Sequence, residues 1–197
     1  MRVRSRHSAA DRGLQLYETV PVATKTLLAH EQLPHGIWEP HCGKGAIAEL
    51  LLDAGHSVYC SDIVDRGYPH QQAVGNFLKA TAVPRGIEAI VMNPPYAEAA
   101  LHVQRALQLC PHVIALLPLS FLEAGREETV AGRARLWCLD RGWLIRVLVF
   151  KERLPMMHRD GWTGKKASSN VPYAWFIWSG DHKGDATVRR ISWKAAS

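Results

Sequence analysis

The sequence predicts a single α/β domain with a doubly wound, mostly parallel sheet and one antiparallel strand near the C-terminus. Short apolar runs alternate with segments of helical periodicity, which is typical of βαβ units. A glycine-rich turn, His41 to Gly45, directly follows the first such run. The chain of 197 residues, 47% of them hydrophobic, is long enough for one sizeable core and too short for two ordinary domains.

The expected elements follow from this alternation. Pro21 suits the first turn of a helix, and Gly55 is a plausible stop for the helix that follows the glycine-rich turn. Helices are expected at residues 20–30, 46–54, 97–110 and 127–141. Strands are expected at 36–39, 57–61, 72–74, 89–92, 113–117, 144–150 and 173–178, with 188–193 as an addition at the edge.

The net charge of +6 is concentrated at the two ends of the chain. Residues 1–12 carry four arginines and one aspartate, and residues 151–197 carry nine basic and four acidic groups. Residues 13–150 carry 11 basic and 13 acidic groups. We expect a flexible basic arm at 1–12 and a single domain at 13–197 whose periphery meets a polyanion, although solvated charge that aids solubility explains the same pattern.

Other features exclude some classes of protein. No stretch approaches the roughly 20 apolar residues of a membrane helix, and the basic start is not followed by the apolar core of a signal peptide. The four cysteines have no metal-ligand spacing and fall mostly in apolar runs, so we expect reduced core thiols in a cytoplasmic protein. The histidines likewise show no ligand spacing, and no metal is assigned.

The first candidate site is the turn after the first strand, Glu39-Pro40-His41-Cys42-Gly43-Lys44-Gly45. Glycines allow a sharp turn and a close backbone approach to a ligand, and the next helix offers free amide groups. A tight turn without a ligand is the alternative. Asp62, at the end of the second strand, favours the ligand because an acid there can accept hydrogen bonds from both hydroxyls of a ribose, although aspartate also simply forms turns.

The most informative motif is the tetrad Asn93-Pro94-Pro95-Tyr96, directly after an apolar strand. The lone pair of an amine attached to an aromatic ring is delocalised, so that the amine is a poor nucleophile. The Asn93 side-chain oxygen and the Pro94 carbonyl can accept its two hydrogens and direct the lone pair toward an electrophilic methyl group. Tyr96 supplies an aromatic face for the ring.

With these motifs the sequence, from about Tyr17 to Trp178, resembles the small bacterial and phage-type DNA N6-adenine methyltransferases that use S-adenosylmethionine. The resemblance implies a Rossmann-like methyltransferase sheet, S-adenosyl-L-methionine as cofactor, and adenine in DNA as substrate. It implies a catalytic role for Asn93, Pro94, Pro95 and Tyr96. It also implies cofactor contacts from Tyr17, Thr19, Glu39, Pro40, Cys42, Gly43, Gly45, Asp62, Ile63, Asn76, Phe77 and Asn93; at Asn76 the family usually has aspartate.

Target recognition is expected in the aperiodic segment 151–170, because no large recognition domain follows the tetrad. The predicted substrate-binding residues there are Arg159, Trp162, Lys165, Lys166 and Ser168. Trp175 or Phe176 can pack beside a flipped base, but a core position suits them better. The same tetrad also serves methylation of RNA bases and of glutamine in proteins. A catalytically silent nucleic-acid-binding subunit is the alternative of another class.

Overall fold

The computed structural model describes residues 18–123, 126–141, 143–155 and 170–195. Its strands are β1 (Gly36–Glu39), β2 (Ser57–Asp62), β3 (Gln71–Val74), β4 (Ala89–Met92), β5 (His112–Pro118), β6 (Leu144–Phe150), β7 (Tyr173–Ser179) and β8 (Thr187–Ile191). The α-helices are α2 (Pro21–His30), α3 (Ala48–Asp53), α4 (Ala99–Leu109) and α5 (Val130–Leu139). Short 3-10 helices occupy η1 (Phe77–Lys79), η2 (Tyr96–Glu98), η3 (Leu119–Leu122) and η4 (Trp193–Ala195).

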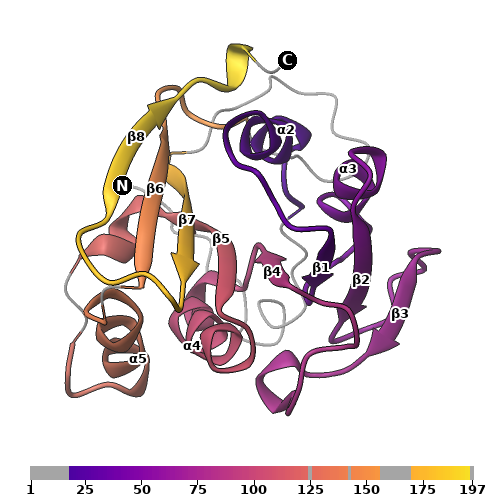
Figure 1. The fold of residues 1–197 in the computed structure, drawn as a ribbon, viewed down its shortest axis with the longest axis horizontal. Coiled ribbons are helices and arrows are strands. Elements are labelled where there is room, and N and C mark those ends of the chain that lie inside the picture. The colour runs from indigo at the N-terminus through magenta and orange to yellow at the C-terminus, as the bar shows by residue number, and fades with distance from the viewer. Residues whose placement is uncertain (1–17, 124–125, 142, 156–169, 196–197) are drawn as a thin grey trace, which may run out of the picture.

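The eight strands form one sheet in the order β3-β2-β1-β4-β5-β7-β6-β8 (Figure 1). β7 pairs antiparallel with both β5 and β6, and every other neighbouring pair is parallel. The predicted α/β class, with a mostly parallel sheet and an antiparallel strand near the C-terminus, is confirmed. The segment predicted as an edge addition is β8, which extends the sheet beyond β6.

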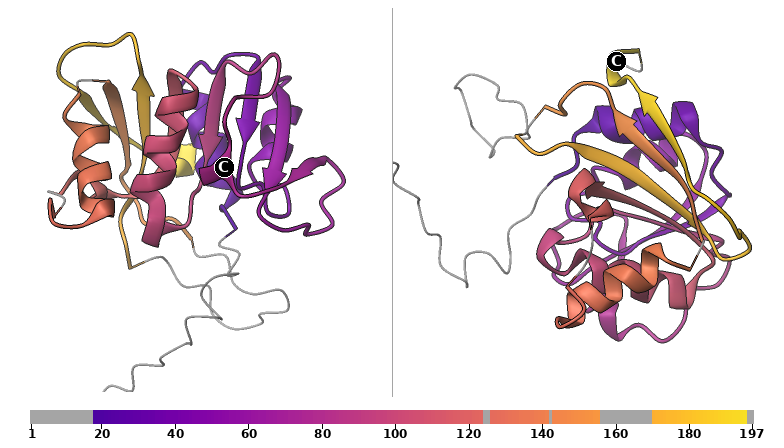
Figure 2. Two further views of the ribbon diagram at one scale, coloured as in Figure 1. Left: turned by 90° about the horizontal axis from the view of Figure 1, so that it is seen from below. Right: turned by 90° about the vertical axis from the view of Figure 1, so that its left-hand side faces the viewer.

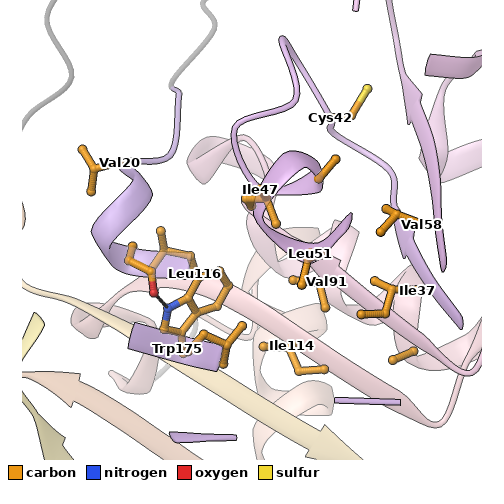
Figure 3. Close-up of a cluster of buried hydrophobic side chains, with 14 of the residues drawn as sticks. Val20, Ile37, Cys42, Ile47, Leu51, Val58, Val91, Ile114, Leu116 and Trp175 are labelled. Carbon is orange, nitrogen blue, oxygen red and sulfur yellow. Dashed lines mark hydrogen bonds between the residues drawn. The ribbon is translucent and has the colours of Figure 1, made fainter. Parts of the chain in front are cut away.

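Two apolar cores cover the two faces of the sheet. The ribbon views in Figure 2 show helices on both sides of the sheet. One core joins α2 and α3 to the sheet, and Leu27 is fully buried in it. Leu51 and Trp175, also fully buried, are seen in Figure 3. The other joins α4 and α5 to the opposite face through residues such as Val103 and Cys138. Each helix buries one face against the sheet, and this burial is the main favourable contribution to folding.

The structure also decides several packing questions that the sequence left open. Trp175 and Phe176 are fully buried, and the indole Nε1 of Trp175 donates a hydrogen bond to the carbonyl of Ala23 at 2.9 Å, so both residues belong to the core. All four cysteines are buried and unbridged, as predicted. None of the helices in the described ranges is long and apolar enough to cross a membrane.

Helix starts are where the predicted and observed bounds differ most. The predicted helix 46–54 begins at Ala48, because Ala46 and Ile47 complete the glycine-rich turn. The predicted helix 127–141 begins at Val130, after Thr129, whose hydroxyl accepts a hydrogen bond from the Gly132 amide at 2.9 Å. A threonine cap fixes a helix start more sharply than apolar periodicity does.

The direction in which the chain winds through the sheet reverses between β1 and β4. From β1 the chain continues to β2 on one side, whereas β4 is followed by β5 on the other, and β1 and β4 lie next to each other. Doubly wound folds bind ligands at such a switch point, beyond the carboxyl ends of the strands. Glu39 ends β1 and Asn93 follows β4, so two predicted site segments meet at this point.

Candidate functional site

The glycine-rich turn after β1 is folded by backbone conformations that suit glycine. Gly43 and Gly45 have positive φ angles of 55° and 89°, a region that other L-residues rarely adopt. The space beside Gly45 is filled by Tyr68, whose ring atom Cε2 would lie 2.2 Å from an added Cβ. Gly45 is therefore required both by its φ angle and by the packing of the tyrosine ring.

Glu39 is a buried carboxyl group at the end of β1, only 1% exposed. It accepts a hydrogen bond from the backbone N–H of Ala48 at the start of α3. Its Oε2 atom has no hydrogen-bond partner within the described parts of the chain. Burial raises the pKa of Glu39 well above its ordinary value, and the nearby Asp62 raises it further. A cationic ligand group beside Glu39 would relieve both effects.

Asp62 connects the second strand to the turn. Its Oδ2 accepts a hydrogen bond from the Gly43 amide at 2.9 Å, and its Oδ1 accepts one from the Val64 amide at 3.2 Å. Ile63, which follows it, leaves 55% of its surface exposed at the carboxyl end of β2. The Asp62 carboxylate thus holds the glycine-rich turn in place, and the exposed apolar side chain of Ile63 follows it directly in the sequence.

Asn76 and Phe77, which follow β3, were predicted to contact the cofactor, and in the structure both also have local structural roles. The side-chain oxygen of Asn76 accepts a hydrogen bond from the Leu78 amide at 2.9 Å and caps η1. Phe77 is buried, with its ring centroid 5.1 Å from that of Trp38. Asn76 is exposed, and the buried Phe77 ring packs edge-on against that of His41, with the two centroids 5.5 Å apart.

The tetrad leaves β4 at the switch point and is tied to the segment before α2. The Asn93 side-chain nitrogen Nδ2 donates a hydrogen bond to the Thr19 hydroxyl at 2.9 Å, across 74 residues of sequence. This bond engages the amide nitrogen and thereby orients the amide oxygen. Pro94 is buried and Pro95 is exposed. The Pro95 carbonyl, just before η2, accepts a hydrogen bond from the amide of Glu98, the last residue of η2.

Tyr96 has an aromatic neighbour that the sequence analysis did not identify as a site residue. The ring of Tyr173 lies 5.5 Å from that of Tyr96, centroid to centroid, at an interplanar angle of 42°. Tyr173 begins β7, which runs antiparallel, so it lies at the same edge of the sheet as the carboxyl ends of β4 and β5. Its position at a strand start after the aperiodic basic segment was the available signal.

A pocket brings three of the predicted segments together. It is lined by the following residues: Glu18, Thr19, Glu39, His41, Cys42, Gly43, Lys44, Ala46 and Asn93. Thr19, Glu39, Cys42, Gly43 and Asn93 were predicted to contact the cofactor. His41 and Lys44 belong to the predicted turn but were given no contact of their own, and neither were Glu18 and Ala46. Asp62 and Gly45 do not line the pocket. Asp62 supports the turn by its hydrogen bond with the Gly43 amide, and Gly45 packs against the Tyr68 ring.

Several predicted features lie outside the described residues. These are the arm at 1–12, Tyr17, and the substrate-binding residues Arg159, Trp162, Lys165, Lys166 and Ser168. Pro40 is described and is buried after β1. No group of three or more histidine, cysteine, aspartate or glutamate side chains that could hold a metal ion occurs in the described ranges.

Comparison with known proteins identifies the fold. No protein-family model matches the chain, and neither does any curated protein. Among solved structures, it is similar to a proposed RNA methyltransferase from Pyrococcus horikoshii, with 13% identity over 80% of this chain and 83% of that chain and a TM-score of 0.54. A proposed hemolysin from Lactococcus lactis is 14% identical over 92% of this chain and 97% of that one, with a TM-score of 0.54.

A third similar structure is the modification subunit of a proposed type I restriction enzyme from Vibrio vulnificus. It is 12% identical over 92% of this chain, with a TM-score of 0.59, and the chain spans 48% of that subunit's length. At such identities the likeness concerns the fold alone. The chain therefore has the Rossmann-like, doubly wound fold that these methyltransferase structures share, with Glu39, Asp62 and Asn93 at the carboxyl edge of its sheet.

Proposed function

We propose that the chain is an S-adenosylmethionine-dependent methyltransferase that transfers a methyl group to the exocyclic N6 amino group of adenine in DNA. The single observation that carries the proposal is that Asn93 lines the same pocket as Glu39 and Gly43 at the switch point of the sheet. This arrangement would put an acceptor for an amine next to a turn suited to a nucleoside-bearing cofactor.

The residues present fit this cofactor. Glu39 offers a buried carboxylate oxygen without a partner in the described parts of the chain, which suits the cofactor's ammonium group. Asp62, at the end of β2, would bind the ribose hydroxyls, and the exposed Ile63 would contact the adenine ring. Thr19, Pro40, Cys42, Gly43, Gly45, Asn76 and Phe77 would complete or support the binding surface, with Tyr17 from the preceding segment.

The cofactor, when bound, supplies an electrophilic methyl group on a sulfonium centre. Asn93 and the Pro94 carbonyl would hold the two hydrogens of the target amine, and Thr19 would keep the Asn93 amide in the required orientation. In the transfer the amine nitrogen held by Asn93 and Pro94 would gain the methyl group as the donor's S–C bond is broken, and it would give up one proton to solvent. The pair of Tyr96 and Tyr173 would hold the target ring at the same edge.

Nucleic acid is favoured over protein as substrate by the charge near the last strands. Arg189 and Lys151 lie close enough to His30 to lower its pKa, after the effect of burial, so their positive charges gather beside α2. Arg146 is different, because it pairs with Glu31. DNA is favoured by the resemblance of the motifs, and a similar fold occurs in a restriction-enzyme modification subunit. The predicted loop residues Arg159, Trp162, Lys165, Lys166 and Ser168 would hold the opened strand around a flipped adenine.

The proposal is tested by transfer of labelled methyl from S-adenosylmethionine to separate DNA, RNA and protein pools, followed by identification of the product nucleosides. We expect N6-methyladenine in DNA. Label confined to RNA or protein, or appearing on cytosine, would contradict the substrate. Asn93→Ala should abolish transfer and leave cofactor binding nearly intact, and binding without transfer by the unaltered chain to any pool would indicate a silent subunit.

A further inference from the structure

Two histidines from distant parts of the chain meet beside the pocket. His41 lies on the glycine-rich turn and His102 on α4, and the His41 Nε2 atom is 2.8 Å from the His102 Nδ1 atom. The Phe77 ring stacks on His102 with an interplanar angle of 12° and meets the His41 ring edge-on, at 72°. The two imidazoles are therefore held in fixed positions by a hydrogen bond and by an aromatic contact.

The hydrogen bond couples the protonation of the two rings. Burial lowers the pKa of His41 well below its ordinary value, with a further contribution from His102, and burial lowers the pKa of His102 to about 4. Both rings are neutral at pH 7, so each carries one N–H. One of the two facing nitrogens donates and the other accepts. The direction of this bond decides whether the Nδ1 atom of His41 is a donor or an acceptor.

His41 lines the pocket, and its Nδ1 atom is buried without a hydrogen-bond partner in the described parts of the chain. Glu39 lines the same pocket, and its Oε2 atom is likewise buried without a hydrogen-bond partner in the described ranges. An ammonium group carries three donors and no acceptor, so it can supply a hydrogen bond to an imidazole nitrogen and to an ionised carboxylate. A buried polar atom without a partner is costly, which favours a ligand group that supplies both bonds.

We propose that His41 accepts a hydrogen bond through Nδ1 from the ammonium group of the cofactor's amino-acid half. His102 is the positioning residue that holds His41 in the required tautomer, because its Nδ1 atom accepts a hydrogen bond from the N–H at His41 Nε2. This inference rests on the proposed function and adds to it a cofactor contact from His41, a residue of the glycine-rich turn to which the family resemblance assigns no contact.

Calorimetry with two ligands tests the inference. S-adenosylhomocysteine carries the ammonium group, and 5′-methylthioadenosine lacks the whole amino-acid half. His41→Phe keeps a ring against Phe77 and removes both nitrogens, so it should weaken S-adenosylhomocysteine binding about tenfold or more and leave 5′-methylthioadenosine binding unchanged. Loss of affinity for both ligands alike, or for neither, would overturn the proposal. Failure of the unaltered chain to bind either ligand would instead count against the proposed function.

Variants of His102 separate positioning from packing. His102→Phe should weaken S-adenosylhomocysteine binding and His102→Gln should restore most of it, because the glutamine oxygen can accept from His41 Nε2. His56→Phe is the matched control and should change neither affinity. The His56 ring is hydrogen-bonded to the Pro34 carbonyl, and His56 lies just before β2, at the amino ends of the strands and away from the pocket.

Nitrogen-15 NMR of the unaltered chain gives a measurement that does not depend on the folding of any variant. The His41 Nε2 signal should be that of a protonated nitrogen, and its Nδ1 signal should move only with S-adenosylhomocysteine. A protonated Nδ1 in the complex would refute the assignment.

Discussion

Replacing Glu39 with glutamine should stabilise the free protein and weaken its binding of cofactor. The carboxyl group is 1% exposed, and its pKa is raised by burial and by Asp62. A group whose pKa is higher in the folded than in the unfolded state stabilises the fold fully below its unfolded pKa, and that contribution is lost as pH rises through the folded pKa. The charged form of Glu39 is thus disfavoured in the free protein at neutral and alkaline pH.

Glutamine keeps the shape of Glu39 and an oxygen for the Ala48 amide, but it cannot ionise. Each pH unit by which folding raises the pKa corresponds to about 1.4 kcal/mol of stability regained at alkaline pH, or roughly 3–6 °C in Tm for a chain of this size. The gain should shrink toward acid and vanish below the pKa of the unfolded state. Loss of a hydrogen bond from an ammonium to a carboxylate costs about 1.5–3 kcal/mol, so S-adenosylhomocysteine binding should weaken by roughly 10- to 150-fold.

The assay combines thermal unfolding from pH 5 to 9 with calorimetry at pH 7.5. In the unaltered protein, affinity for S-adenosylhomocysteine should fall as pH is lowered and Glu39 takes up a proton, because the ammonium favours ionised Glu39. Glu39→Gln should remove this pH dependence. Glu88→Gln is the matched control, since Glu88 accepts a hydrogen bond from the Gly36 amide at the amino end of β1. A Glu39→Gln protein less stable than the original at pH 9 would refute the burial argument, and unchanged affinity would refute the ammonium contact.

Three further substitutions test the packing that supports the site. Gly45→Ala should lower the free energy of unfolding, measured with denaturant, by about 2–4 kcal/mol. The φ of 89° is strained for alanine, and the new Cβ would meet the Tyr68 ring. A near-neutral result would contradict this packing. Thr19→Val should lower methyl transfer with a stability loss of about 1 kcal/mol, because Asn93 loses its acceptor, and Thr19→Ser should restore activity. Trp175→Phe should cost about 1–3 kcal/mol and leave cofactor affinity unchanged, and altered affinity would argue against a purely core role.

The elements themselves could be predicted because buried parallel strands appear as apolar runs. The run 89–92 was predicted with its exact bounds, and the weak signal at 72–74 is a real strand, β3. Helix starts were less predictable where a side chain or a turn defines them, as Thr129 does for α5. The candidate site was predicted to the extent that its residues follow strands directly, as Glu39, Asp62 and Asn93 do.

Contacts between distant segments could not be predicted, because they depend on which strands are neighbours. Thr19 meets Asn93 across 74 residues, and His41 meets His102 across 61. Tyr173 reaches Tyr96 because β7 pairs with β5 in the antiparallel direction. Periodicity records only whether a residue faces a core, and it carries no information about the order of strands in the sheet.

The sequence by itself determined the α/β alternation, the glycines that the turn requires, and the tetrad at the end of a strand. These are local properties, set by burial and by the allowed conformations of single residues. Only the tertiary structure decided that the turn, the tetrad and the segment before α2 line one pocket. It did so because the order of strands places β1 beside β4, and the polar atoms that meet there come from elements far apart in the chain.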